Sequence, residues 1–248
     1  MIRKKQGEIE WLEFELLQRY PSLRHAVFLR HGGVSEGPFS SLNISRSVGD
    51  NPSSVFENRT RICRVFGCSE FWMGHQVHGV SIQKACKGLF LLESCDGLFT
   101  QEKGRPLLIQ HADCQAAIFY DPVNNMLANI HCGWRGSVQN IYQKTVDLFR
   151  LNGSHPSNIL VCISPSLGPL ASEFIHFKNE LPEEFWAFRR QEVLFDFWQI
   201  SAFQLEQAGI LSSHIEIASI CTHANQEDYF SYRRGRVTGR HATLAQLV

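Results

Sequence analysis

The chain has 248 residues, and 24 Lys and Arg residues balance 24 Asp and Glu residues, so its formal net charge is zero. This balance argues against a dedicated binder of nucleic acid or of anionic membranes, which normally carries a clear basic excess. No segment approaches the ~18 apolar residues of a membrane span, and the charged N-terminus lacks the apolar core of a signal peptide. We therefore expect a globular protein of the cytoplasm, where its eight cysteines stay reduced.

Neither a fixed-period repeat nor a low-complexity linker divides the chain. We therefore predict one compact domain over residues 1–248, and we expect a monomer.

The predicted elements mix strands and helices along the chain. A strand over 25–30 is followed by a helix that begins near Pro52 and ends by Gly67. A second helix begins at 133–137 and continues through Phe149, and a third covers 192–208. Mixed elements of this kind predict an α/β or α+β fold without fixing its topology. The other predicted strands are 71–73, 107–109, 116–120, 126–130, 160–163 and 215–220.

Three candidate ligands, His78, Cys114 and His131, lie where an apolar strand gives way to a loop. Two imidazoles and one thiolate suit Zn²⁺, and three protein ligands leave a fourth tetrahedral position open, as in catalytic zinc sites. However, the spacings of 36 and 17 residues match no local zinc signature. The residues alone leave open that Cys114 is a small core residue and that each histidine is a partner of the backbone.

A series of motifs covers the chain from about residue 25 to its C-terminus. They include Arg30-His31-Gly32-Gly33-Val34-Ser35, Gln76-Val77-His78-Gly79, Cys95-Asp96-Gly97, Ala112-Asp113-Cys114, His131-Cys132-Gly133-Trp134-Arg135-Gly136, Phe230-Ser231-Tyr232-Arg233-Arg234 and Thr238-Gly239-Arg240. In this order they resemble the bacterial YfiH-type laccase-domain family, also called the polyphenol-oxidase-type, purine nucleoside phosphorylase or peptidoglycan editing factor family. The resemblance implies a mixed α+β domain of sheets flanked by helices, similar to the catalytic domain of the cytotoxic necrotizing factors.

The same resemblance implies that zinc is the cofactor and that His78, Cys114 and His131 are its ligands and the catalytic residues. It implies phosphorolysis of adenosine, inosine and guanosine to the free base and ribose 1-phosphate, with adenosine deamination and, in some members, methylthioadenosine cleavage. Water activated by a metal suits the deamination, whereas the part of the metal in phosphorolysis does not follow from the residues. We expect purine nucleosides and phosphate as partners, and neither nucleic acid nor membrane.

Arginine is the natural holder of phosphate because its planar fork donates two parallel charge-assisted hydrogen bonds. An asparagine can bind ribose hydroxyls, and an aspartate beside the thiolate can orient a ligand, although all these residues are also common in turns. The predicted substrate-binding residues are Arg30, Asn43, Arg59, Asp113, Arg233 and Arg234.

Two neighbours of the proposed ligands depart from the family pattern: His111 stands where threonine is usual, and Cys132 where alanine is usual. We expect both to affect the metal site.

Three alternatives remain. Cys114 could be a nucleophile activated by His131 or His78, in a Cys/His hydrolase or an amidase that edits peptidoglycan precursors. Copper-dependent oxidation of phenols is disfavoured, because the paired His-x-His and His-Cys-His motifs of multicopper oxidases do not occur. A non-catalytic metal-binding module is the third.

Overall fold

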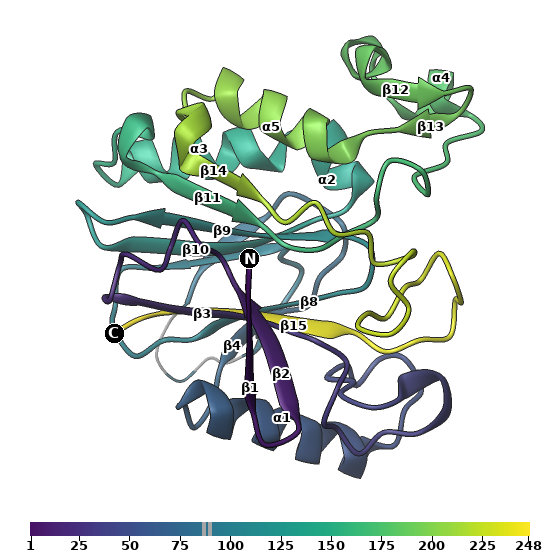
Figure 1. Cartoon of the computed structure of the whole chain (residues 1–248). Helices are drawn as coiled ribbons and strands as arrows, with labels where there is room; N and C mark the ends of the chain where they lie inside the picture. The colour runs from purple at the N-terminus through teal and green to yellow at the C-terminus, as the bar shows by residue number, and fades with distance from the viewer. Residues whose placement is uncertain (86–87, 89–90) are drawn as a thin grey trace.

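The computed structural model describes residues 1–85, 88 and 91–248, and it has four layers: two β-sheets packed face to face, with helices on both outer faces (Figure 1). In spatial order, the seven-stranded sheet contains β1 (Ile2–Gln6), β2 (Ile9–Glu13), β3 (Leu23–Phe28), β15 (His241–Leu247), β8 (Leu107–His111), β4 (Trp72–Gly74) and β6 (Leu91–Leu92). The six-stranded sheet contains β14 (Ile215–Ile217), β11 (Leu160–Ile163), β9 (Gln115–Asp121), β10 (Met126–Cys132), β7 (Gly97–Thr100) and β5 (Ile82–Lys84). The predicted mixed fold of sheets flanked by helices is confirmed.

Helices cover the outer face of each sheet (Figure 1). Helix α1 (Pro52–Phe66) packs on the seven-stranded sheet, and α3 (Ile141–Leu151) and α5 (Phe197–Gln207) pack on the six-stranded sheet. The shorter elements are η1 (Gly37–Phe39), α2 (Trp134–Val138), η2 (Pro156–Asn158), α4 (Phe177–Glu180), η3 (Glu183–Phe188), the hairpin of β12 (Arg189–Gln191) and β13 (Leu194–Phe195), and η4 (Ser212–His214).

Strand β9 explains why the central strands have continuous apolar sequences. Every residue of β9 is buried. Because side chains alternate along a strand, Ala117 and Phe119 pack toward the helices, whereas Ile118 and Tyr120 pack toward the other sheet. A strand covered on both faces therefore shows an unbroken apolar run.

A buried asparagine links the two sheets near the site. The side-chain amide of Asn129 in β10 donates to the carbonyls of Leu107 in β8 and Thr243 in β15, at 2.9 Å each. Both carbonyls belong to the other sheet. These bonds fix β10 and β8 relative to each other, and the two strands lead to candidate ligands.

The first predicted helix is confirmed with its boundaries. The Asn51 side chain accepts a hydrogen bond from the Ser53 amide at 2.8 Å, and Pro52 opens the helix. The helix ends at Gly67, whose φ of 75° lies in the left-handed region that favours glycine.

The other two predicted helices are wrong in part. The segment from 133 to 149 forms two helices, because Asn140 adopts a φ of 52° and its side chain caps α3 through the Gln143 amide. The helix predicted over 192–208 begins only at Phe197, since residues 194–195 form β13 and Asp196 caps α5 through the Gln199 amide at 3.0 Å.

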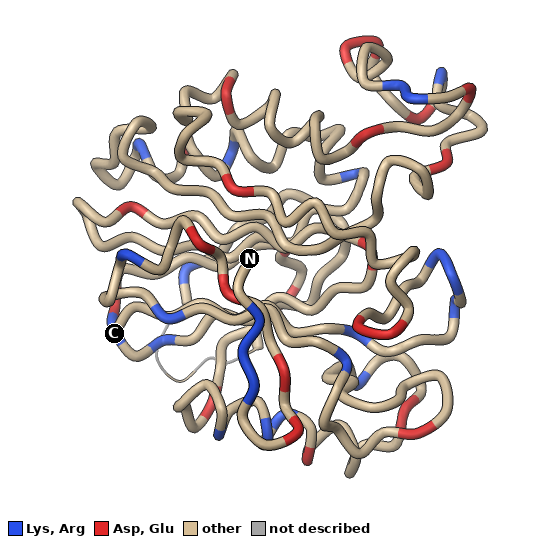
Figure 2. The backbone as a smooth tube through the Cα atoms, in the orientation of Figure 1, with Lys and Arg blue, Asp and Glu red and all other residues tan. Residues whose placement is uncertain are grey.

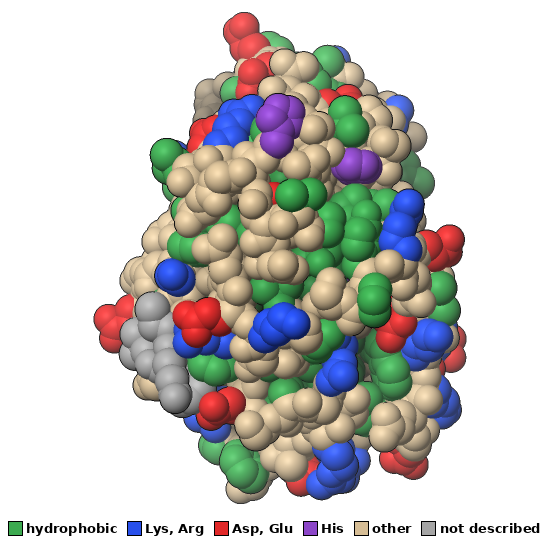
Figure 3. Space-filling view, turned by 90° about the vertical axis from the view of Figure 1, so that its left-hand side faces the viewer, with side chains coloured by type: hydrophobic (Ala, Val, Ile, Leu, Met, Phe, Trp, Pro, Cys, Tyr) green, Lys and Arg blue, Asp and Glu red, His purple; other side chains and the backbone are tan. Residues whose placement is uncertain are grey.

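Charged residues of both signs are spread over the backbone in Figure 2, as the zero net charge leads one to expect. On the face seen in Figure 3, Lys and Arg side chains alternate with Asp and Glu around apolar groups, without a continuous basic stripe. In the described part of the chain, no helix combines the length and apolar character that a membrane crossing needs.

Candidate metal centre

His78 lies in the loop that leads from β4 to β5, and a buried carboxylate holds this loop. The amides of Val77, His78 and Gly79 donate to the carboxylate of Asp96 at 3.2, 2.9 and 2.7 Å. His78 has a φ of 60°, a strained conformation for a residue with a side chain. These bonds therefore fix the backbone from which the exposed side chain of His78 extends.

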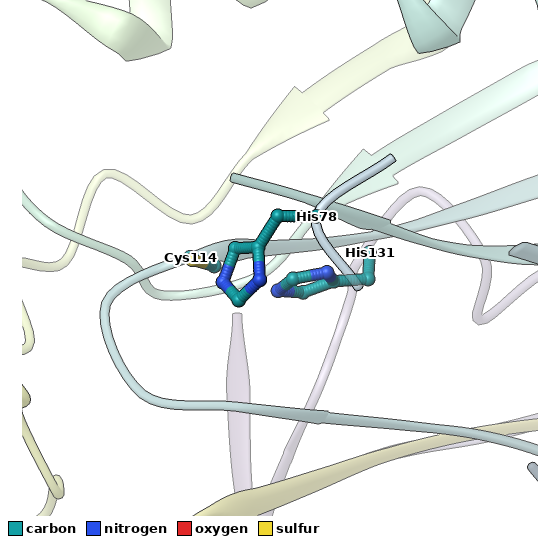
Figure 4. A group of neighbouring side chains, drawn as sticks. All are labelled: His78, Cys114 and His131. Atoms are coloured by element: carbon teal, nitrogen blue, oxygen red, sulfur yellow. The ribbon is translucent and has the colours of Figure 1, made fainter. Parts of the chain in front are cut away.

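His131 lies near the end of β10 and is almost fully buried. Its Nδ1 is 2.8 Å from Oδ1 of Asp96. Because this bond occupies Nδ1, the other ring nitrogen, Nε2, is the one available to a metal ion. The rings of His78 and His131 meet edge to face, with their centroids 4.9 Å apart (Figure 4).

Cys114 lies in the short connection from β8 to β9, next to Asp113, which has a φ of 79°. Both carboxylate oxygens of Asp113 are engaged: Oδ1 accepts from the Thr222 hydroxyl at 2.6 Å, and Oδ2 accepts from the Ser231 hydroxyl at 3.0 Å and the Arg233 amide at 2.6 Å. Asp113 thus fastens the Cys114 connection to the C-terminal loop that carries Arg233.

One potential ligand atom from each of His78, Cys114 and His131 lies within 4.8 Å of the other two (Figure 4). Among the residues that the structure describes, only these three form such a group of His, Cys, Asp or Glu side chains. A common ion can reach all three after small side-chain shifts, since Zn–N and Zn–S bonds are about 2.0–2.3 Å long. The set of two imidazoles and one thiol, with Nδ1 of His131 held by a carboxylate, fits Zn²⁺.

The electrostatics of the group favour a thiolate beside an imidazolium. Burial by itself would raise the pKa of Cys114, but the charges and hydrogen bonds of His131 and His78 lower it to about 6. Burial likewise opposes charge on His131, but Cys114 and Asp96 raise its pKa to about 9. A metal ligand must be deprotonated, so the low pKa prepares Cys114 for binding.

The three side chains open into a cavity of about 910 Å³. Its apolar walls include Trp134, Leu167, Phe174, Phe197 and Tyr232. Its basic lining consists of Arg135, Arg233, Arg236 and Arg240. The cavity thus combines aromatic surface and positive charge next to the candidate metal centre.

Of the four arginines predicted to bind substrate, only Arg233 lines this cavity. Arg30 donates to the carbonyls of Ser40 and Gln226 and stacks on Phe230. Arg59 donates to the Ile44 carbonyl. Arg234 donates to the carbonyls of Thr222, His223 and Tyr229. These three guanidinium groups hold loops together.

Asn43 is fully buried away from the cavity lining. Its side-chain oxygen accepts from the amides of Ser45 and Arg240, and its amide group donates to Asp50 at 2.8 Å. All of its polar atoms are therefore engaged within the protein.

The two residues that depart from the family pattern both border the cavity. The His111 ring contacts the Thr243 hydroxyl at 2.8 Å, and burial holds its pKa well below the usual value, so the ring is neutral. Burial raises the pKa of Cys132 to about 12, and its sulfur lies 3.3 Å from the Ser137 hydroxyl. Cys132 therefore remains a thiol outside the ligand group.

Sequence reasoning missed Asp96 and three of the cavity arginines. Asp96 stood in the quoted Cys95-Asp96-Gly97 motif, and Arg135 and Arg240 in quoted glycine-containing motifs, so a signal existed for these three. Arg236 had no such signal.

Comparison with known proteins gives a consistent result. The family model described as multi-copper polyphenol oxidoreductase laccase matches residues 24–248. A purine nucleoside phosphorylase of Pseudomonas aeruginosa is 31% identical over 237 residues, which cover 91% of this chain and 93% of the relative. The purine nucleoside phosphorylase YfiH of Escherichia coli is 31% identical over 231 residues, covering 88% and 91%.

Solved structures agree with this result. The Bacillus licheniformis hypothetical protein YfiH superimposes with a TM-score of 0.90 at 27% identity and covers 99% of both chains. YlmD from Geobacillus stearothermophilus gives a TM-score of 0.89 at 28% identity, covering 99% of this chain and 98% of YlmD.

Proposed function

The chain belongs to the laccase-domain family whose members include YfiH and YlmD, and on this premise we propose that it is a zinc-dependent purine nucleoside phosphorylase. The observation that carries the proposal is one cavity in which His78, Cys114 and His131 stand beside aromatic side chains and arginines. At about 910 Å³ the cavity is within the usual range for small-molecule sites.

Different residues of the cavity suit different parts of the substrate, the purine base and the phosphate. Trp134, Phe174 and Tyr232 offer apolar surface to a purine base. The arginines offer the charge-assisted hydrogen bonds that phosphate requires. We assign phosphate chiefly to Arg233, Arg236 and Arg240, because these residues line the cavity. Arg233 also donates to the Glu173 carbonyl, and Arg240 to the carbonyls of Thr238 and Gly239.

Zn²⁺ bound by His78, Cys114 and His131 would act as a Lewis acid and would lower the pKa of water, which also suits deamination of adenosine. The protein's own part is to hold the ligands: Asp96 keeps the proton of His131 on Nδ1, and Asp113 fixes the Cys114 connection. We include adenosine deamination, and methylthioadenosine cleavage as a further activity, in the proposal.

The test is incubation of the purified protein with inosine or adenosine, with and without phosphate, followed by chromatography. Release of hypoxanthine or adenine that depends on phosphate, with formation of ribose 1-phosphate, supports phosphorolysis. Inosine formed from adenosine without phosphate supports deamination. If high enzyme concentration yields neither product, the proposal is wrong.

A second candidate is a Cys/His hydrolase or an amidase acting on peptidoglycan precursors. The observation that favours it is the chain of contacts from Cys114 through His131 to Asp96, since a nucleophile, a base and an orienting acid form such a series. Metal analysis separates the two candidates. Equimolar zinc in the native protein that is lost in Cys114→Ala favours the phosphorylase. Copper in place of zinc in the native protein would favour oxidase chemistry. Metal-free native protein with rapid alkylation at Cys114 alone favours the hydrolase.

We further propose that residues 1–248 act as one domain in the cytoplasm. The seven cysteines that the structure describes are free thiols, which suits a reducing compartment.

A further inference from the structure

Asp96 is itself neither part of the cavity lining nor a member of the ligand group, yet it has an unusually complete set of hydrogen bonds. It is fully buried directly before β7. Oδ1 lies 2.9 Å from the His78 amide and 2.8 Å from Nδ1 of His131. Oδ2 accepts from the amides of Val77 at 3.2 Å and Gly79 at 2.7 Å. Each carboxylate oxygen therefore receives two donors.

The backbone of Asp96 also forms hydrogen bonds to the loop that carries His78 and to the end of β10. Its carbonyl accepts from the His131 amide at 2.6 Å, and its amide donates to the Ser81 carbonyl at 2.9 Å. The ligand loop, the start of β7 and the end of β10 are thus joined through one residue.

The loop conformation depends on this carboxylate. Three successive amides point at one anion, as in the backbone concavities that bind anions. The φ of 60° at His78 costs of order 1 kcal/mol or more and persists only where the surroundings enforce it. The hydrogen bonds from Val77, His78 and Gly79 provide that enforcement.

We propose that Asp96 is a positioning residue of the metal centre, which sets the backbone of His78 and the ring orientation and tautomer of His131 with one carboxylate. The inference rests on the metal centre of the proposed function and is independent of the substrate. A carboxylate that fixes a ligand histidine typically contributes a factor of about 10–100 to metal affinity. Here one carboxylate acts on both histidines.

Only a side chain in which both terminal atoms accept hydrogen bonds can position both histidines. In Asp96→Asn, one oxygen becomes an NH₂ group. If this group faces Val77 and Gly79, it meets two donors and displaces the His78 loop. If it faces His131, it favours the tautomer with the proton on Nε2, which blocks the nitrogen that would bind the metal. Either orientation weakens the centre.

The experiment compares Asp96→Asn with Asp121→Asn. Asp121 is a matched control because it is also fully buried and its carboxylate also accepts several donors, here the Val123 and Asn124 amides and the Asn124 side chain. It lies at the end of β9 remote from Cys114. Zn²⁺ affinity is measured by competition with a chromophoric chelator, and ligand geometry by the visible absorption spectrum of the Co²⁺-substituted protein.

We expect Asp96→Asn to bind Zn²⁺ about 10–100-fold more weakly and to change the Co²⁺ spectrum. We expect Asp121→Asn to retain wild-type affinity and spectrum although it loses stability. Wild-type affinity and spectrum in folded Asp96→Asn would overturn the proposal, as would an equal loss of affinity in both variants. Because no nucleoside is used, these results are separate from the failure of phosphorolysis.

A measurement on the native protein covers the case in which Asp96→Asn does not fold. In the zinc-loaded protein, nitrogen-15 NMR should find the His131 proton on Nδ1, and the amides of residues 77–79 should resist hydrogen exchange despite the exposure of His78. A proton on Nε2, or exchange at the rate of a free loop, would overturn the proposal.

Discussion

Gly133 lies against two of the candidate ligands, His78 and Cys114, and its replacement by alanine tests the geometry of the centre. It directly precedes α2, with φ −80° and ψ 173°, a conformation that alanine also adopts. A Cβ at this position would lie 2.9 Å from Cδ2 of His78 and 3.2 Å from Sγ of Cys114. Gly133→Ala therefore acts through contact with the ligands and without backbone strain.

The size of the displacement follows from these distances. An ordinary contact between such atoms is about 3.5–4.0 Å, so the His78 ring must move away by at least about 0.6 Å. Metal–ligand distances tolerate only about 0.2 Å. We therefore expect Zn²⁺ affinity to fall by about tenfold or more, ~1.4 kcal/mol. The exposed His78 ring can move, so we expect little change in the unfolding temperature of the metal-free protein.

Gly136→Ala is the matched control. A Cβ at Gly136 would have ordinary contacts, the nearest being Sγ of Cys132 at 3.5 Å. Both variants are assayed by chelator competition for Zn²⁺ and by phosphate-dependent cleavage of inosine. The reasoning is refuted if Gly133→Ala binds zinc as tightly as the wild type, or if Gly136→Ala loses the metal to the same extent.

Four further outcomes follow from the contacts described above. Cys114→Ala should be isolated without zinc and without phosphorolysis, by metal analysis and chromatography; retained equimolar zinc would contradict the ligand assignment. In metal-free protein, the thiolate of Cys114 forms as pH rises through about 6, so alkylation should be half-maximal there, whereas a midpoint above pH 8 would exclude the ion pair with the imidazoles. Arg236→Ala should raise the KM for phosphate about tenfold with KM for inosine unchanged, whereas Arg30→Ala should lower the unfolding temperature and leave both KM values unchanged; the reverse pattern would return Arg30 to the phosphate site. Burial lowers the pKa of His25 to about 4 and of His241 to about 3. Below pH 6.5 both histidines are protonated in the unfolded chain but remain neutral in the folded protein. The free energy of unfolding, measured in urea, should therefore fall by about 1.4 kcal/mol per pH unit for each ring as the pH drops toward 4. A constant free energy of unfolding would contradict their burial as neutral rings.

The central strands could be predicted from the sequence because burial on both faces leaves an unmistakable apolar run. Strand β9 is of this kind. Strand β15 was missed although all its residues are buried, because His241, Thr243 and Gln246 interrupt its pattern. These polar groups are buried inside the sheet, where the bond between His111 and Thr243 compensates for part of their burial. The hydrophobicity pattern of a sequence does not show which hydrogen-bond partners a buried polar side chain will have.

The candidate ligand triad could be predicted, and the arginines that surround it could not. Residue type at strand ends left the three candidate ligands open, and the family motifs singled them out; their proximity in the structure agrees with the prediction. Arginine has no comparable signature, because the same guanidinium binds a carbonyl or a phosphate. Arg30 and Arg234 meet backbone carbonyls only because loops distant in sequence fold against them. This depends on the tertiary structure alone.

The topology explains why the ligands are far apart in sequence. His78 lies in the connection from β4 to β5, and Cys114 in the connection from β8 to β9, so both lie where the chain crosses from the seven-stranded to the six-stranded sheet. His131 lies near the end of β10 in the six-stranded sheet, and Asn129 in the same strand bonds to the seven-stranded sheet. An ion held by all three therefore joins the two sheets, as Asn129 does. An ion that binds only the folded chain stabilises it by about 4 kcal/mol at a thousand times its dissociation constant, so binding of a metal at this centre would be thermodynamically linked to the packing of the two sheets.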